Sequence, residues 1–438
     1  MGMQSTYAPS PDKMIGMVNG DWINQASQFR SMVPSRRRRF LAQLGLALGA
    51  PVVFADLLSQ SGIFPRALAQ SALEKGWPGK EELRLLSDRP LNAEAYATLL
   101  DDPITPNHRH FVRNNGLIPD RAKEGNLSDW SLRVDGEVQQ VLDLDMAALK
   151  GSFKHVSAAL VIECGGNGRA GFYPKVGGNP WTLGAVGCAR YTGARLRDVL
   201  REAGVRDSAV YLAYHAEDPT LNREPGKAPI SRGVPIEKAL DPHTLLAWEM
   251  NGVPLPPEHG FPLRLICPGW PGSTSGKWLK RLQVRDRVHD GPKMTGTSYR
   301  VPRHPVAPGE KVPEEDFEII GVMPVKSLIT RPAHLFQTLK AEPLEVGGHA
   351  WCGEGKVRQV DVTIDYGSTW QRAKLQAPVN PYAWQSWHCA LQFPGKGYFE
   401  VWARATDEQG RHQPMVVPGW NPKGYLNNAM HRIAVQVI

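Results

Sequence analysis

The proline-rich segment between residues 291 and 313 separates two parts of the sequence that have different patterns. Before it, strand-like apolar runs are interspersed with helical periodicity, which is typical of an α+β domain. After it, short alternating runs separated by turn residues continue to the last residue, which is typical of an antiparallel β-sandwich of immunoglobulin type. The segment itself holds Pro302, Pro305, Pro308 and Pro313, so we expect it to be a linker.

Several individual elements are expected from periodicity. In the first part the pattern predicts strands over residues 130–136, 209–214 and 262–267, and helices over residues 142–149 and 195–204, the second with a glycine stop. In the second part, six strands are expected over residues 344–351, 357–365, 370–375, 386–393, 397–407 and 431–438.

Residues 1–69 have the features of a twin-arginine export signal. Arg37 and Arg38 precede an apolar run over residues 41–58, and Ala67-Leu68-Ala69 forms a small-x-small site before Gln70. The alternative is a basic helix that packs on the protein itself. An export signal predicts a periplasmic protein, and no other apolar stretch is long enough to span a membrane, so we expect no stable membrane insertion.

Charge and cysteine usage limit the possible ligands. The formal net charge of +8 suggests an anionic ligand or an acidic partner, although the arginine-rich N-terminal stretch contributes part of it, and it does not imply nucleic-acid binding. Five cysteines are an odd number for an oxidising compartment, so at least one is free or ligated. Because no Cys-x-x-Cys-His motif occurs, we expect no covalent c-type haem in this chain.

Two turns carry candidate functional residues. The apolar run over residues 158–162 predicts a buried strand that ends in a glycine-rich turn with Cys164 and Arg169. The glycines would let the backbone approach a bulky group, and the alternative is a buried cysteine before an ordinary turn. The second turn, Arg113-Asn114-Asn115-Gly116, offers a guanidinium fork and amide groups to an anion, or else it is a surface turn.

Six blocks occur in one order along the chain: residues 111–114 (FVRN), 163–169 (ECGGNGR), 178–181 (GNPW), 258–264 (EHGFPLR), 275–279 (SGKWL) and 427–432 (NNAMHR). In this order they resemble the sulfite oxidase family of molybdopterin enzymes, and more closely its bacterial periplasmic sulfite dehydrogenases without a fused haem domain. The resemblance implies an α+β catalytic domain over residues 70–300 with one molybdenum-molybdopterin cofactor per chain. It also implies an immunoglobulin-like domain over residues 313–438 that often forms a homodimer.

The resemblance also implies roles for residues around the substrate. The cysteine of the second block binds molybdenum in this family, so Cys164 is the expected metal ligand, and a soft thiolate suits such a metal. By the same match, Arg113 and Arg169 should line the substrate pocket, with Trp181 as a wall. Tyr299 matches the active-site tyrosine, whose hydroxyl would bond to substrate.

Other matched residues are expected to hold the cofactor. His259, Arg264, Ser275 and Lys277 match positions that bind the pterin phosphate, and a cationic cluster beside a Ser/Gly turn suits a phosphate. The expected pterin contacts are Asn114 and Asp218.

The sequence departs from the family at two positions near the substrate. Lys423 stands where vertebrate-type enzymes place a further substrate arginine, so it would supply the charge without the bidentate fork. Gly177 stands where a lysine is found four residues before the pocket tryptophan. Weaker or altered oxyanion binding would follow.

The expected function is oxidation of sulfite to sulfate with electrons passed to a separate c-type cytochrome. Alternatives on the same fold are a sulfane-sulfur dehydrogenase or an oxidoreductase acting on sulfoxides or other small oxyanions. An exported binding protein that has lost the metal is an alternative of another class.

The remaining cysteines have simpler expected roles. Cys188 and Cys267 are expected to be buried small hydrophobes. Cys389 lies in one expected strand and Cys352 directly follows another, and these two cysteines either form a disulfide or remain free.

Overall fold

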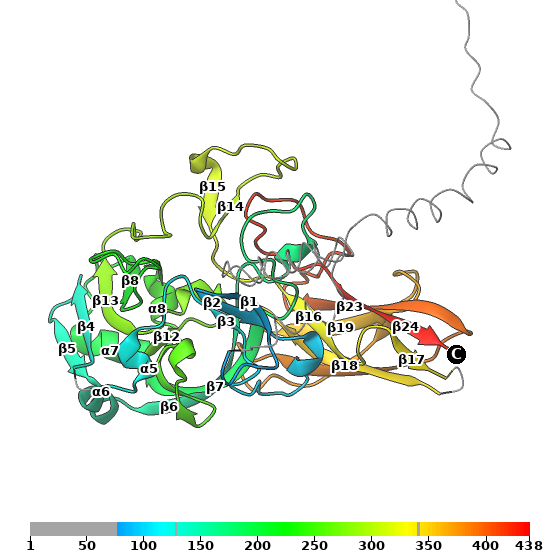
Figure 1. Cartoon of the computed structure of the whole chain (residues 1–438), viewed down its shortest axis with the longest axis horizontal. Helices are drawn as coiled ribbons and strands as arrows, with labels where there is room; N and C mark the ends of the chain where they lie inside the picture. The colour runs from blue at the N-terminus through cyan, green and yellow to red at the C-terminus, as the bar shows by residue number, and fades with distance from the viewer. Residues whose placement is uncertain (1–76, 128, 340–341) are drawn as a thin grey trace, which may run out of the picture. The chain divides into compact units, whose positions relative to one another are not determined.

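The computed structural model describes residues 77–438 except residues 128, 340 and 341 (Figure 1). The expected export signal over residues 1–69 therefore lies outside the described residues. Within the described part of the chain, no helix is long and apolar enough to cross a bilayer. The described residues all belong to one compact unit.

Three sheets and short helices form the part before residue 291, drawn in blue to green in Figure 1. One sheet has the order β11-β10-β7-β6, with β12 also paired to β10; a second has the order β5-β4-β13-β8-β9; the third is β1-β2-β3. Their bounds are β1 (Arg84–Asp88), β2 (Leu91–Glu94), β3 (Val112–Arg113), β4 (Ser131–Gly136), β5 (Leu142–Asp145), β6 (His155–Glu163), β7 (Val186–Arg195), β8 (Tyr211–Ala216), β9 (Gly233–Pro235), β10 (Leu245–Met250), β11 (Val253–Pro254), β12 (Arg264–Ile266) and β13 (Leu279–Arg285). The helices are α5 (Asp120–Lys123), α6 (Met146–Ser152), α7 (Leu196–Ala203) and α8 (Ile236–Ala239).

Strand β6 is apolar over a continuous run because both of its faces are buried. Leu160 and Ile162 point into a core that also contains Cys164, whereas Ala159 and Val161 point into a core shared with residues beyond 313, including Trp351. The expected buried strand before the Cys164 turn is therefore confirmed, and it lies between the two parts of the chain.

The two expected helices differ in outcome. Helix α7 confirms the second one: its apolar side is buried, and Gly204 ends it in the left-handed conformation at φ 66°. The prediction of a helix over residues 142–149 is wrong for its first half, because residues 142–145 form β5. The Asp145 side chain accepts the N–H of Ala148 at 2.7 Å, so this N-cap starts α6 at Met146.

Two sheets enclose one apolar core in the part after residue 313, drawn in yellow to red in Figure 1. Their orders are β16-β18-β22-β21 and β17-β24-β23-β19-β20. The bounds are β16 (Lys326–Arg331), β17 (Phe336–Thr338), β18 (Leu344–Trp351), β19 (Val357–Thr363), β20 (Gln371–Arg372), β21 (Lys374–Leu375), β22 (Gln385–Leu391), β23 (Gly397–Asp407) and β24 (His431–Val437).

The single strand expected over residues 370–375 is two strands in different sheets. β20 pairs with β19, and β21 pairs with β22. Ala373, which lies between them, is buried and donates its N–H to the carbonyl of Val360 at 2.9 Å. The chain thus crosses from one sheet to the other at this residue.

The segment over residues 291–313 is also more ordered than a linker. It contains β14 (Arg300–Pro302), which pairs with β15 (Phe317–Ile319) in a two-stranded sheet.

All five cysteines lie within the described residues, and all are free and buried. The possible disulfide between Cys352 and Cys389 is therefore absent. Cys389 on β22 pairs with Val346 on β18, whereas Cys352 follows the far end of β18. Six residues of strand separate the two positions by roughly 20 Å, which no disulfide spans.

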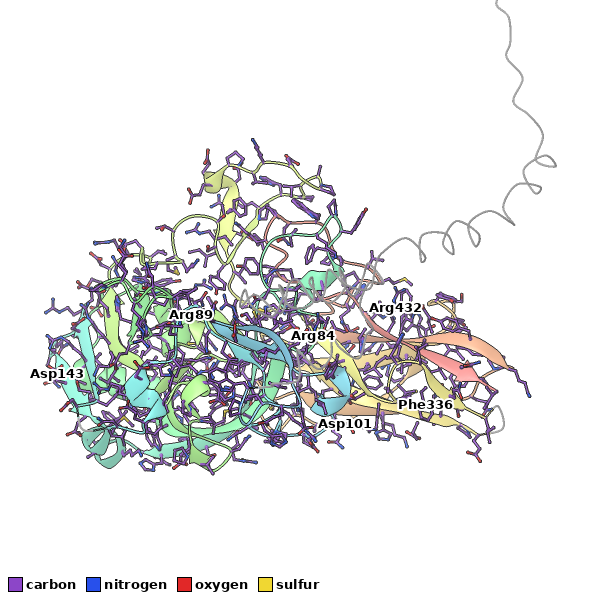
Figure 2. All side chains as sticks on the ribbon, in the orientation of Figure 1. Arg84, Arg89, Asp101, Asp143, Phe336 and Arg432 are labelled. Carbon is purple, nitrogen blue, oxygen red and sulfur yellow. The ribbon has the colours of Figure 1, made fainter. Side chains whose placement is uncertain are left out.

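The two parts of the chain are joined along the outer edge of β6. The carbonyl of Tyr382 accepts the N–H of Val161 at 2.8 Å, and Asn380 Nδ2 donates to the carbonyl of Ala159 at 2.8 Å. These bonds cover an edge strand that would otherwise be open. A further contact is the 2.6 Å ion pair between Arg331 and Asp101. Of these two residues, Asp101 is labelled in Figure 2.

Candidate functional site

The Cys164 turn lies at the junction of two cavities. The inner cavity is lined by nine of the twelve expected site residues: Arg113, Asn114, Cys164, Asp218, His259, Arg264, Ser275, Lys277 and Tyr299. The outer cavity is lined by five of them: Arg113, Cys164, Arg169, Tyr299 and Lys423. The two cavities share three lining residues, Arg113, Cys164 and Tyr299. These residues mark the place where the two cavities meet.

Hydrogen bonds fix the backbone of this turn. The N–H of Cys164 donates to the carbonyl of Ala185 at 2.9 Å, and the carbonyl of Cys164 accepts the N–H of Asn167 at 2.8 Å. The N–H of Arg169 closes a second turn on the carbonyl of Gly166 at 3.0 Å. The side chain of Cys164 is nearly buried, since the residue is 8% exposed. A thiol is thus held at a defined point of the cavity wall.

Cationic side chains dominate the wall of the inner cavity. Arg264 is buried, and burial lowers the pKa of its guanidinium. Burial, followed by the nearby Arg264, holds the pKa of Lys277 well below its usual value. Lys277 donates to Asn114 Oδ1 at 2.5 Å and to the carbonyl of Glu258 at 2.7 Å. Cationic side chains that are crowded together in this way favour a bound anion. The negative charge of the anion would raise their pKa values again and so stabilise their protonated forms.

Lys80 belongs to this cluster, although no sequence pattern indicates it. Its Nζ lies 2.7 Å from His259 Nε2 and 3.5 Å from a Glu258 carboxylate oxygen. Burial lowers the pKa of Lys80 to about 8, so it is charged at neutral pH. Since an ammonium only donates, Nε2 of His259 must accept, and the imidazole proton is on Nδ1. Burial, followed by the charge of Lys80, holds the pKa of His259 well below its usual range.

Asp218 is the expected pterin contact on the loop after β8. It is buried, and desolvation raises the pKa of its carboxyl to about 7. A carboxyl with this pKa exchanges a proton near neutral pH, so it can either accept or donate a hydrogen bond to a heterocycle.

Unsatisfied donors show that the inner cavity fits an anionic heterocyclic cofactor. Arg264 Nε and Asn114 Nδ2 are buried without a hydrogen-bond partner. Ser275 Oγ accepts the N–H of Cys267 at 2.9 Å, which leaves its own O–H free to donate. Buried donors without partners are costly, and a phosphate with an amide-containing ring would satisfy them. No group of three or more His, Cys, Asp or Glu side chains within residues 77–438 is arranged to hold a metal ion.

The outer cavity is built around Arg169, which is 8% exposed. Its Nε donates to the carbonyl of Lys423 at 2.9 Å and its Nη1 to the carbonyl of Asn179 at 3.0 Å. Because a guanidinium has five N–H donors, donors remain for an anion. A Cβ on Gly166 would lie 2.3 Å from Arg169 Nη2, so this glycine makes room for the arginine side chain. At Gly166, the bulky group that the turn admits is therefore the Arg169 side chain.

Two stacked tyrosines lie between two arginines beside the junction. The rings of Tyr299 and Tyr425 are 5.7 Å apart and nearly parallel, and the N–H of Tyr299 donates to the Tyr425 hydroxyl at 3.3 Å. Arg169 lies over Tyr425 at 5.0 Å, and Arg232 lies over Tyr299 at 4.7 Å. We call these four residues the arginine-tyrosine stack. It holds the Tyr299 ring, whose hydroxyl is 3.3 Å from Asn115 Nδ2.

Trp181 does not form a wall of either cavity, so this expectation is wrong. The residue is fully buried and packs edge-on against Phe111, at 6.5 Å between ring centroids. Phe111 lines the inner cavity in its place. Trp181 supports the wall from behind, because the turn over residues 178–181 directs its side chain into the core that contains Cys164.

Eleven of the twelve expected residues thus line the two cavities, and three further residues lie beside them. Tyr425 could have been suspected, since it lies between Lys423 and the block over residues 427–432. Lys80 and Arg232 lie outside the six blocks, and no pattern in the sequence indicated them.

Comparisons with known proteins agree with this site. Residues 117–293 match the model of the "Oxidoreductase molybdopterin binding domain", and residues 317–438 match the "Mo-co oxidoreductase dimerisation domain". Sulfite oxidase of Gallus gallus is 33% identical over 452 aligned positions, which cover 97% of this chain and 96% of that protein. The mitochondrial sulfite oxidase of Mus musculus is 34% identical over 81% of this chain, but this chain spans only 66% of its length.

One solved structure has the same fold. The sulfane dehydrogenase SoxCD of Paracoccus pantotrophus aligns with a TM-score of 0.64 and 24% identity, over 86% of this chain and 92% of that chain. The family predicted from six sequence blocks is confirmed by the identity to the chicken enzyme over nearly its whole length. The chain belongs to the sulfite oxidase family of molybdopterin enzymes and is a molybdopterin-dependent oxidoreductase.

Proposed function

We propose that this chain is a sulfite dehydrogenase that oxidises sulfite to sulfate and passes electrons to a separate c-type cytochrome. The observation that carries the proposal is Cys164 at the junction of an inner cavity rich in cationic side chains and an outer cavity lined by Arg113, Arg169 and Lys423. The reaction, SO₃²⁻ + H₂O → SO₄²⁻ + 2 H⁺ + 2 e⁻, needs a redox group and an oxyanion site next to each other.

The inner cavity would hold the molybdenum-molybdopterin cofactor. When bound, this group supplies oxygen-atom transfer to sulfur and stores two electrons. Cys164 would bind the metal through its thiolate. The phosphate would be held by Arg264, Lys277, Ser275 and the Nδ1–H of His259. Asn114 and Asp218 would bond to the pterin ring.

The outer cavity would bind the substrate anion. Guanidinium groups stay charged and grip oxyanions through two N–H donors, so Arg113 and Arg169 would hold sulfite by its oxygens. This leaves the sulfur free to face the inner cavity. The Tyr299 hydroxyl at the junction would donate a further hydrogen bond, and Lys423 would add positive charge at the mouth.

The proposal includes the wider organisation of the protein. An α+β catalytic domain would extend over residues 70–300, followed by a domain of immunoglobulin type over residues 313–438. The two sheets around one core support this type. The match of residues 317–438 to a dimerisation domain supports a homodimer. We also propose export to the periplasm by the twin-arginine pathway, on the sequence of residues 1–69.

A second candidate keeps the fold and the cofactor but changes the substrate. One similar solved structure is a sulfane dehydrogenase, and a lysine at position 423 lacks the bidentate fork of an arginine. Oxidation of sulfane sulfur, or turnover of a sulfoxide or another small oxyanion, would fit the same cavities. A binding protein without metal is the alternative of another class.

Steady-state turnover tests the proposal. The protein is purified from a host that makes molybdopterin, its molybdenum is measured by elemental analysis, and sulfite or a sulfane-sulfur compound is supplied with cytochrome c as acceptor. We expect one molybdenum per chain and turnover with sulfite. Turnover with the sulfane compound alone favours the second candidate, and absence of molybdenum from the folded protein favours the binding protein.

A further inference from the structure

The carboxylate of Glu163 joins the Cys164 turn to the sheets after residue 313. Glu163 is the last residue of β6 and directly precedes Cys164. Its Oε1 accepts from Lys326 Nζ at 2.5 Å and from Asn167 Nδ2 at 3.0 Å. Its Oε2 accepts from Trp351 Nε1 at 2.9 Å. Both carboxylate oxygens are therefore bonded, and two of the three donors come from the far part of the chain.

This cluster is buried. Glu163 is 3% exposed and Lys326 is 6% exposed, and Trp351 and Asn167 are buried as well. Lys326 on β16 is the direct register partner of Trp351 on β18. Two neighbouring positions of one sheet thus converge on a single carboxylate. Because a buried charge without a partner is strongly unfavourable, the charge of Glu163 holds β6 to this pair of positions.

The same cluster extends into the turn through Asn167. While Asn167 Nδ2 donates to Glu163, its Oδ1 accepts the N–H of Ala185 at 3.1 Å. The carbonyl of Ala185 in turn accepts the N–H of Cys164. Closed sets of hydrogen bonds of this kind restrict backbone motion. The Cys164 backbone is therefore connected to Lys326 and Trp351 through two residues, Glu163 and Asn167.

We propose that Lys326 and Trp351 are positioning residues for the metal ligand. By holding the Glu163 carboxylate, they fix the backbone from which the Cys164 thiol projects. Lys326 also neutralises a carboxylate one residue away from the thiolate, where two unscreened negative charges would repel. The sheets after residue 313 would thus support the metal site of the same chain, in addition to any part in dimer formation. The assignment of Cys164 as the ligand rests on the proposed function.

Hydrogen exchange on the full chain as purified tests this proposal. We expect Lys326→Met and Trp351→Phe to speed exchange of the amides of residues 164–168 by about tenfold or more, because the turn loses its fixed carboxylate. In samples that hold molybdenum, the thiolate-to-metal charge-transfer absorption should also shift in Lys326→Met. Molybdenum content is measured on each sample.

Lys238→Met is the matched control. Lys238 is similarly buried, pairs with Asp241 at 3.0 Å and reaches the Tyr382 hydroxyl across the same junction at 3.1 Å. We expect it to lower the unfolding free energy comparably while exchange at residues 164–168 and the absorption stay as in the wild type. Equal acceleration of exchange in both lysine variants would mean general loosening and would overturn the proposal.

Rescue by a second substitution tests the role of the charge. Glu163→Gln in the Lys326→Met background removes the unpaired carboxylate while its amide oxygen still accepts from Trp351 or Asn167. We expect exchange at residues 164–168 to return to within about threefold of the wild type. An unchanged turn in Lys326→Met, or no rescue by Glu163→Gln, would count against the positioning role. Since exchange is measured whether or not metal is bound, these outcomes are separate from failure of the proposed function, which would appear as absent molybdenum.

Discussion

The guanidinium carbon of Arg169 lies 5.0 Å above the ring of Tyr425, which joins the Cys164 turn to the segment before β24. The contact continues through the parallel ring of Tyr299 to Arg232, so two cations enclose two aromatic rings. Burial lowers the pKa of Arg232, and its other contacts are Ser273 Oγ at 2.6 Å and Met294 Sδ at 3.5 Å. Aromatic faces stabilise such cations without neutralising them, so their positive potential stays available to an anion.

Tyr425→Ala should weaken substrate binding. Loss of the ring removes a desolvated cation–π contact worth about 1 to 2 kcal/mol and frees Arg169 and Tyr299 to move. We expect KM for sulfite to rise about tenfold, with a smaller change in kcat. Tyr425→Phe keeps the stack and loses only the hydroxyl that accepts from Tyr299, so its KM should change less than threefold. Equal effects of both variants in steady-state assays would rule out the stack as the cause.

Cys164→Ser should fold but lose activity. A hydroxyl is a far weaker ligand than a thiolate for a soft metal, so turnover should fall below detection. Cys188→Ser is the control, because Cys188 is fully buried and burial raises the pKa of its thiol to about 12. That variant should keep its turnover while losing about 1 to 3 kcal/mol of unfolding free energy for a buried hydroxyl. Wild-type turnover in Cys164→Ser would refute the assignment of the ligand.

The sequence could predict the parts of the site that lie within short blocks. The strand before Cys164 is a continuous apolar run, and Arg113, Asn114, His259 and Lys277 lie in or beside recognisable turns. Eleven of the twelve residues that the family resemblance implied line the two cavities. The prediction for Trp181 was wrong because a tryptophan after a turn can point either to a cavity or to the core. Only its packing against Phe111 determines which of these two orientations it takes.

Contacts between distant segments could not be predicted. Lys80 meets His259 across 179 residues, and Lys326 meets Glu163 across 163 residues. The residues next to a lysine in the sequence do not indicate which distant residue its ammonium group will contact. The split of residues 370–375 into β20 and β21 likewise depends on which neighbour each half pairs with. Alternation along one strand does not contain this information.

Asp218 should make stability depend on pH in the cofactor-free protein. Burial raises the pKa of its carboxyl from 3.8 to about 7, so the folded state binds more protons than the unfolded state between these values. Its contribution to the unfolding free energy is therefore fully present below pH 4 and is lost as pH rises through about 7. The loss is on the order of 4 kcal/mol. Urea denaturation between pH 4 and 8 should show this slope in the wild type and a flatter profile in Asp218→Asn.

Gly177→Lys should strengthen binding of the substrate anion. Gly177 lines the outer cavity, and a Cβ added there meets no atom within 4 Å, so a lysine fits without displacing the wall. An added charge near the anion contributes about 1 kcal/mol at short range in a water-like medium, so KM for sulfite should fall about fivefold at low salt. The gain should shrink at 0.5 M salt, where charges are screened over a few ångströms. Gly151→Lys is the control: it adds the same charge on α6, where a Cβ is equally free and no residue of either cavity lies. A fall in KM of the same size in both variants would show that net charge, rather than the cavity, attracts the anion.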